Sequence, residues 1–148
     1  MKKLALGLVA ALALFKAGAE DLQWMTDLSK AQAKAKAENK LVMLDFTGSD
    51  WCGWCIKLNK EVFSKPEFSE YAKKNLVLVE VDFPRQKQQS ADQKKANQAL
   101  QKKYNIEGYP TIIVLDANGK KVAETGYVPG GPKAFLADLE KKLKDKQT

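Results

Sequence analysis

The stretch GSDWCGWC, residues 48–55, contains both cysteines of this 148-residue chain, Cys52 and Cys55. Three kinds of site place two cysteines this close together: a structural disulfide, one half of a metal site, and a redox centre that opens and closes. Each kind of site requires different neighbours. The surrounding sequence therefore decides among them.

An apolar run of strand length, residues 41–46, ends shortly before the cysteines. We expect a helix to begin near Cys52 and to carry Cys55 one turn further along, on the same side. At the start of a helix, unpaired N–H groups and the helix dipole stabilise a thiolate, and cysteine pKa values of roughly 3.5 to 7.5 occur there. The pattern thus predicts Cys52 as the attacking sulfur and Cys55 as the shielded sulfur that resolves a mixed disulfide.

The other two kinds of site fit this pair poorly. A disulfide that closes a loop of about four residues stabilises by roughly 1.9 kcal/mol in the chain-entropy model, against about 3 kcal/mol for fifteen residues. A zinc or iron–sulfur site needs more soft ligands than two cysteines, and the chain has no histidine. The lack of histidine also excludes Ser/His/Asp and Cys/His catalysis. We therefore predict a redox pair with no metal and no bound cofactor, because the two sulfurs carry the electrons.

Further apolar runs predict strands at residues 76–81 and 111–115 and, more weakly, at 122–127. The runs at 41–46, 76–81 and 111–115 are apolar on both alternating faces, which is typical of strands covered by helices on two sides. An Asn118-Gly119 turn signal joins the last two runs and predicts an antiparallel hairpin.

Helical patterns lie between and around these strands. The Lys/Ala-rich residues 30–40 and the Lys/Gln-rich residues 86–103 have apolar residues at helical spacing, and a last helix follows the break at residues 129–132. A capping-box pattern at Ser64 predicts another short helix. The expected inward positions are Leu28, Ala31 and Ala35, then Ala96, Ala99, Leu100 and Tyr104, and finally Phe135, Leu136, Leu139 and Leu143. The order predicts an α/β domain, a mixed sheet of four or five strands flanked by helices.

The first nineteen residues have a short basic start, an apolar run and small residues at 17–19. This predicts a cleaved signal peptide at residues 1–19, a mature domain at 20–148, and a periplasmic or otherwise extracytoplasmic location. Cleavage leaves 22 basic residues against 18 acidic ones, a net charge of about +4. The lysines are dispersed and Arg85 is the single arginine, so we expect no nucleic-acid partner.

Three segments together resemble the thioredoxin superfamily: Trp51-Cys52-Gly53-Trp54-Cys55, the stretch YNIEGYPT at residues 104–111, and the Asn-Gly turn. The resemblance implies a thioredoxin-like three-layer sandwich. It implies that Pro110 is cis and lies against the cysteine pair, and that the backbone of Tyr109 pairs with an extended substrate segment. It also implies that Asp45 is a buried carboxylate that relays protons to Cys55. The lysine that neighbours this acid in thioredoxin has no counterpart in residues 76–81.

These observations predict an exported thiol:disulfide oxidoreductase that exchanges disulfides with cysteines of other exported proteins. Trp51 and Trp54 flank Cys52 and are expected to form a flat apolar collar for a docking peptide, together with Tyr109 and Pro110. The plainer alternatives are that the tryptophans only cover the end of the sheet and that Asp45 is an ordinary acid at the end of a strand.

The direction of electron flow rests on the residues between the cysteines. Trp54 stands where strong oxidants of the superfamily have a histidine, which favours a reductase or isomerase, acting as a monomer and kept reduced by a membrane thiol-reducing electron donor. Oxidase and cytochrome-maturation roles remain open at this point. The alternative from another class is a non-catalytic thioredoxin-like binding or chaperone module with a silent cysteine pair.

Overall fold

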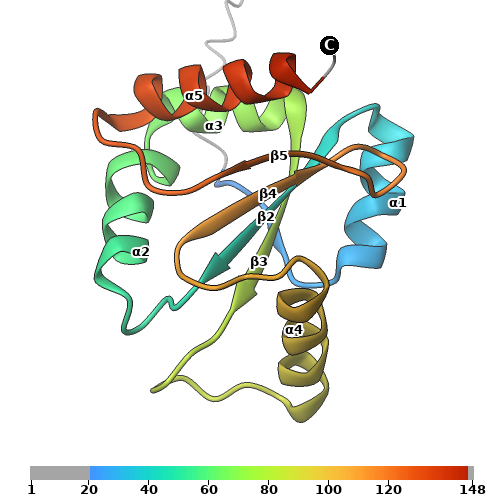
Figure 1. Ribbon diagram of the computed structural model, residues 1–148, viewed down its shortest axis with the longest axis vertical. Coiled ribbons are helices and arrows are strands. Elements are labelled where there is room, and N and C mark those ends of the chain that lie inside the picture. The colour runs from blue at the N-terminus through green and yellow to red at the C-terminus, as the bar shows by residue number, and fades with distance from the viewer. Residues whose placement is uncertain (1–20, 147–148) are drawn as a thin grey trace, which may run out of the picture.

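The computed structural model describes residues 21–146 (Figure 1). The predicted signal peptide at residues 1–19 lies outside the described residues. Within the described part of the chain, no helix is both long and apolar enough to span a membrane.

Five strands form one mixed sheet in the order β1-β3-β2-β4-β5. β3 is parallel to β1 and β2, whereas β4 is antiparallel to both β2 and β5. The strands are β1 Trp24–Met25, β2 Leu41–Thr47, β3 Leu76–Asp82, β4 Thr111–Leu115 and β5 Lys121–Thr125. The sequence did not predict β1, because two residues are too few to show an alternating pattern. Its Trp24 packs against the ring of Phe63, with centroids 5.3 Å apart.

Helices cover both faces of the sheet (Figure 1). One face is packed against α2, η1, α3 and α5, and the other against α1 and α4. The helices are α1 Leu28–Glu38, α2 Gly53–Leu58, the π-helical turn η1 Asn59–Phe63, α3 Pro66–Asn75, α4 Ala91–Lys103 and α5 Gly131–Asp145. The expected three-layer α/β sandwich is confirmed.

Side chains along β2 alternate between the two faces of the sheet, and this alternation determines which face carries Asp45. Val42, Leu44 and Phe46 pack beneath α1 and α4, whereas Met43 packs on the face of α2, α3 and α5. Asp45 is two residues beyond Met43, so its side chain points to the same face as Met43. The face of α2 is the one that carries the cysteines.

The predicted capping box at Ser64 is wrong. α3 begins at Pro66 after Lys65, which makes no side-chain capping bond, and the hydroxyl of Ser64 donates instead to the carbonyl of Lys60, at 2.8 Å. Ser64 ends η1, so its hydroxyl serves the preceding helix. Proline at the first helical position has no N–H to cap.

The predicted inner face of α4 is also partly wrong. Ala96 and Ala99 are exposed, and Asn97 is buried in their place. Its side-chain amide donates to the backbone carbonyl of Asp82 at 2.9 Å, so the residue is polar but satisfied. The helix begins at Ala91 rather than near residue 86, because Ser90 caps it and residues 83–89 form a loop.

Candidate active site

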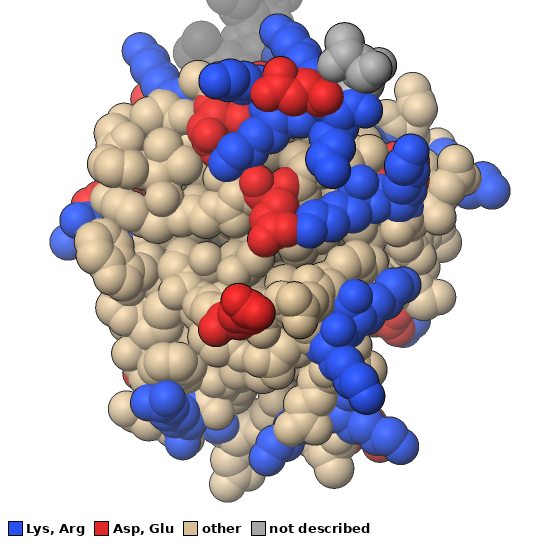
Figure 2. Space-filling view, viewed as in Figure 1, with Lys and Arg blue, Asp and Glu red and all other residues tan. Residues whose placement is uncertain are grey.

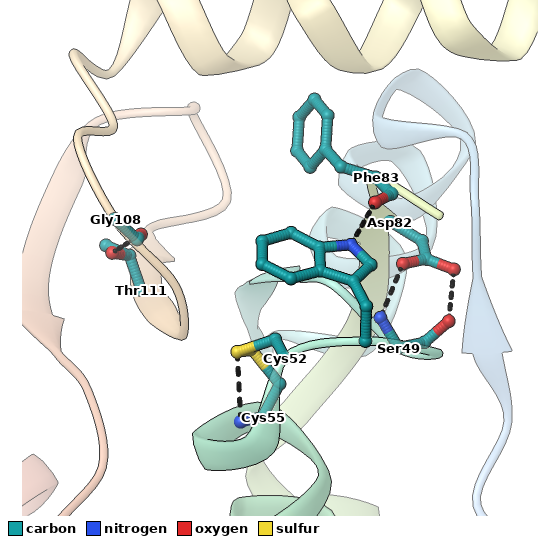
Figure 3. The surroundings of a disulfide bond; sticks show 8 residues. Ser49, Cys52, Cys55, Asp82, Phe83, Gly108 and Thr111 are labelled. Atoms are coloured by element: carbon teal, nitrogen blue, oxygen red, sulfur yellow. Dashed lines mark hydrogen bonds between the residues drawn. A yellow bond between two sulfur atoms is a disulfide. The ribbon is translucent and has the colours of Figure 1, made fainter. Parts of the chain in front are cut away.

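Cys52 and Cys55 form a disulfide at the start of α2 (Figure 3). Cys52 is the N-cap of this helix, and its Sγ accepts the backbone N–H of Cys55 at 3.2 Å. Both residues are largely buried, with 7% and 5% of their surface exposed. In the disulfide form, the two cysteines are therefore almost equally buried. The asymmetry lies in the helix end, where an N–H group points at the first sulfur and stabilises a thiolate there.

The loop before β4 faces the disulfide in Figure 3, from Gly108 to Thr111. Its Tyr109–Pro110 peptide bond is cis, as the family resemblance implied. The hydroxyl of Thr111 donates to the carbonyl of Gly108 at 2.7 Å, which closes the loop. The ring of Tyr109 meets that of Trp51 edge to face, with centroids 5.9 Å apart, so this loop and the cysteine loop are in contact.

The two tryptophans beside Cys52 have different surroundings. The indole N–H of Trp51 donates to the carbonyl of Phe83 at 2.8 Å, which fixes the ring within the loop. Trp54 is 57% exposed and leans on Tyr127, with ring centroids 5.0 Å apart. The face of the molecule over α2 carries few charged side chains, as Figure 2 shows. Of the predicted collar, Trp54 is the most exposed residue, whereas Trp51, Tyr109 and Pro110 are partly buried.

Asp45 lines a pocket of about 330 Å³ together with Cys55, Asn59, Lys60 and Glu80. The acid is buried, and its Oδ1 has no hydrogen-bond partner. Burial raises the pKa of Asp45 to about 8, and the nearby negative charges of Glu80 and Asp82 act in the same direction. A carboxyl with this pKa exchanges protons near neutral pH.

Glu80 is a member of this pocket that sequence reasoning missed. It stands directly opposite Asp45 in the parallel register of β2 and β3. Burial and the charge of Asp82 raise the pKa of Glu80, while Lys87 opposes them. The signal was present in the sequence, because residues 76–81 carry an acid where a lysine was sought. That Glu80 lies opposite Asp45 could be known only from the register of β2 and β3.

Sequence reasoning also missed the segment of residues 83–87 that follows β3. The carboxylate of Asp50 accepts the backbone N–H groups of Arg85, Gln86 and Lys87, at 3.0, 2.8 and 2.7 Å. The backbone N–H of Ser49 donates to the carboxylate of Asp82 at 2.9 Å, and its hydroxyl donates to the second oxygen (Figure 3). The loop that leads to Cys52 is thereby joined to the end of β3.

The chemistry of this site resides in the two sulfurs. Among the residues that the structure describes, no group of three or more Cys, Asp or Glu side chains has an arrangement that would hold a metal ion. A disulfide at a helix start, beside a cis-proline loop and above a buried acid, supports thiol–disulfide exchange.

A family model described as a thioredoxin-like domain matches residues 28–142. The chain belongs to the thioredoxin-like family, and its disulfide-linked Cys-Gly-Trp-Cys motif marks it as a thiol:disulfide oxidoreductase. It is similar to a protein of Chlamydia pneumoniae named disulfide bond reductase DsbH, at 39% identity over 126 residues that cover 85% of this chain and 75% of that protein.

Solved structures agree with this assignment. A structure titled DsbH oxidoreductase superposes with a TM-score of 0.80 at 36% identity, and the match covers 97% of this chain and 95% of that one.

The chain is also 36% identical over 121 residues to the thiol:disulfide interchange protein DsbD of Cronobacter sakazakii. That match covers 80% of this chain but spans only 19% of the length of DsbD.

Proposed function

We propose that this protein is an extracytoplasmic reductase that transfers electrons from Cys52 and Cys55 to disulfides of other exported proteins. The observation that carries the proposal is the setting of Cys52. Its sulfur is capped by the backbone N–H of Cys55, and no histidine or lysine lies between the cysteines. The thiolate is thus stabilised moderately, which makes the reduced form a good electron donor. The name of the similar DsbH, a disulfide bond reductase, supports this direction.

The reaction takes two exchange steps. The Cys52 thiolate attacks one sulfur of a substrate disulfide, the substrate S–S bond breaks, and one substrate sulfur leaves as a thiolate. Cys55 then loses its proton and attacks Sγ of Cys52, which releases the second substrate thiolate and forms the Cys52–Cys55 disulfide. Two electrons pass to the substrate. Asp45, in the pocket that Cys55 also lines, accepts the Cys55 proton.

The substrate segment is held by the surfaces on the two sides of the disulfide. The backbone of Tyr109, ahead of cis-Pro110, pairs with an extended chain as in the resemblance above. The exposed ring of Trp54 supplies the apolar contact, and the ring of Trp51 packs edge to face against that of Tyr109. The active unit is a monomer and needs no cofactor.

The location and the electron source follow from the same proposal. The sequence pattern of residues 1–19 supports export. A pair that acts as a reductase in an oxidising compartment closes after each turnover, so a dithiol donor at the membrane must open it again.

Trapping the thiols in cells that produce the full chain tests the proposal. Rapid acid quenching followed by a mass-tagging alkylating reagent is expected to show both thiols mainly free. The chain is expected in the envelope fraction with a mass that lacks residues 1–19. The Cys52→Ala/Cys55→Ala double variant gives the untagged reference. A pair found mainly as the disulfide in growing cells would instead indicate a donor of disulfides.

A further inference from the structure

The loop of residues 83–87 forms a fixed wall beside the cysteine loop. The three N–H bonds to Asp50 hold its backbone, and the indole N–H of Trp51 holds the carbonyl of Phe83. The backbone bonds from Arg85, Lys87 and Gln86 also hold the pKa of Asp50 below its usual range. The Asp50 carboxylate, which holds the loop of residues 83–87 in place, is therefore ionised throughout the neutral pH range. Residue 85 is thus held in place although the loop is exposed.

Arg85 projects from this wall onto the cysteine loop. Its guanidinium carbon lies 3.6 Å from the centroid of the Trp51 ring. The edge-to-face contact of Trp51 with Tyr109 continues this wall to the cis-proline loop. The cation therefore lies over the side chain of the residue that precedes Cys52, the cysteine that a substrate disulfide must reach.

Within the part of the chain that the structure describes, Arg85 has no carboxylate partner. Across residues 21–146, none of the ion pairs involves Arg85. Asp50 is occupied by its three backbone N–H groups, and Asp82 is occupied by Ser49. Stacking on an indole uses the face of a guanidinium and leaves its N–H groups free at the edge. A guanidinium edge matches the two oxygens of a carboxylate.

We propose that Arg85 is a specificity-determining residue that binds a carboxylate side chain next to the reactive cysteine of a protein substrate. Substrates with Asp or Glu beside the cysteine are therefore reduced faster than neutral ones. This inference rests on the proposed disulfide-reducing function, and it names the kind of segment that the site prefers.

Matched peptide disulfides test the inference. Two peptides that differ only in Glu or Gln beside the cysteine are offered to the reduced protein, and the rate constant of the first exchange step is measured. At low salt we expect the Glu peptide to react about threefold to fivefold faster, the effect of one exposed ion pair, and the preference to fade at about 0.5 M salt.

Variants assign that preference to Arg85. Arg85→Gln is expected to remove the preference while the Gln peptide reacts within about twofold of its wild-type rate, and Arg85→Lys is expected to keep part of it. Lys36→Gln, which removes an exposed cation on α1 at the far end of β2, is the matched control and should keep the preference. Equal loss on both peptides in Arg85→Gln, or no preference in the wild type, would overturn the inference. Reduction of neither peptide would overturn the proposed function as well.

Discussion

Cys52→Ala is expected to abolish capture of substrates, whereas Cys55→Ala is expected to hold them as stable mixed disulfides. Only Cys52 caps α2 and receives the backbone N–H of residue 55, so only its thiolate is stabilised for attack. Without Cys55, the adduct on Cys52 cannot be resolved. We expect Cys55→Ala to trap more than about ten times as much adduct as Cys52→Ala at neutral pH, from the difference in thiolate fraction.

Non-reducing electrophoresis of both variants, produced in parallel with the double variant, measures the adducts. Mass spectrometry of the Cys55→Ala adducts also identifies the substrates. Equal trapping by the two single variants would contradict the assigned roles of the cysteines.

Asp45→Asn is expected to slow the second exchange step and to leave the first step nearly intact. With a pKa of about 8, the carboxyl of Asp45 gains its basic form as the pH rises through this value and accepts the Cys55 proton. Loss of such a positioned base is expected to slow resolution by at least about tenfold between pH 7 and pH 8. Dithiobis-nitrobenzoate separates the steps, because attack by Cys52 releases one coloured thiolate and resolution by Cys55 releases another.

Glu80→Gln is the matched variant for this experiment. It keeps Asp45 and removes the neighbouring negative charge, which lowers the pKa of Asp45. The pH at which the second release becomes fast should therefore move downward. A second-step rate in Asp45→Asn equal to that of the wild type at every pH would leave Asp45 with a packing role only.

The same buried acid predicts a large effect on stability. The pKa of Asp45 is raised from 3.8 to about 8, so its contribution favours folding below about pH 4 and is lost as the pH rises through 8. Asparagine stays neutral, so at pH 9 we expect Asp45→Asn to exceed the wild type in unfolding free energy. The gain is on the order of several kcal/mol, because a tenfold change in proton affinity is about 1.4 kcal/mol.

Denaturant unfolding of the disulfide form, in which no thiol titrates, measures this difference from pH 4 to pH 9. The gain should shrink steadily toward pH 4. A gain that does not change with pH would show that Asp45 is not protonated in the folded protein.

Local patterns in the sequence predicted most of the sheet and the place of the cysteines. Continuous apolar runs predicted β2, β3 and β4, because strands covered on both faces need no polar alternation. The Asn-Gly turn predicted the hairpin of β4 and β5, and the cysteines fell at the helix start as expected. The cis bond before Pro110 came from the family resemblance, since no local rule distinguishes it from the trans form.

The features that were missed depend on contacts between distant segments. Glu80 became part of the site only through its register opposite Asp45. In the sequence, Arg85 was one of many dispersed cations. In the structure, its backbone N–H donates to Asp50 and its guanidinium lies over Trp51. Asn97 lies inside α4 in place of the expected alanines, and its side-chain amide donates to the carbonyl of Asp82, which is distant in sequence.

The reduction potential of the Cys52–Cys55 pair tests the central claim most directly. The expected mature domain, residues 20–148, is equilibrated with glutathione buffers of known ratio, and the reduced fraction is measured by alkylation. We expect a value between those of thioredoxin, about −270 mV, and of the disulfide isomerases, about −180 mV, because the helix end stabilises the Cys52 thiolate and no histidine stands between the cysteines. A potential close to about −120 mV, as in strong oxidants of the superfamily, would contradict the reductase assignment and indicate that the protein donates disulfides.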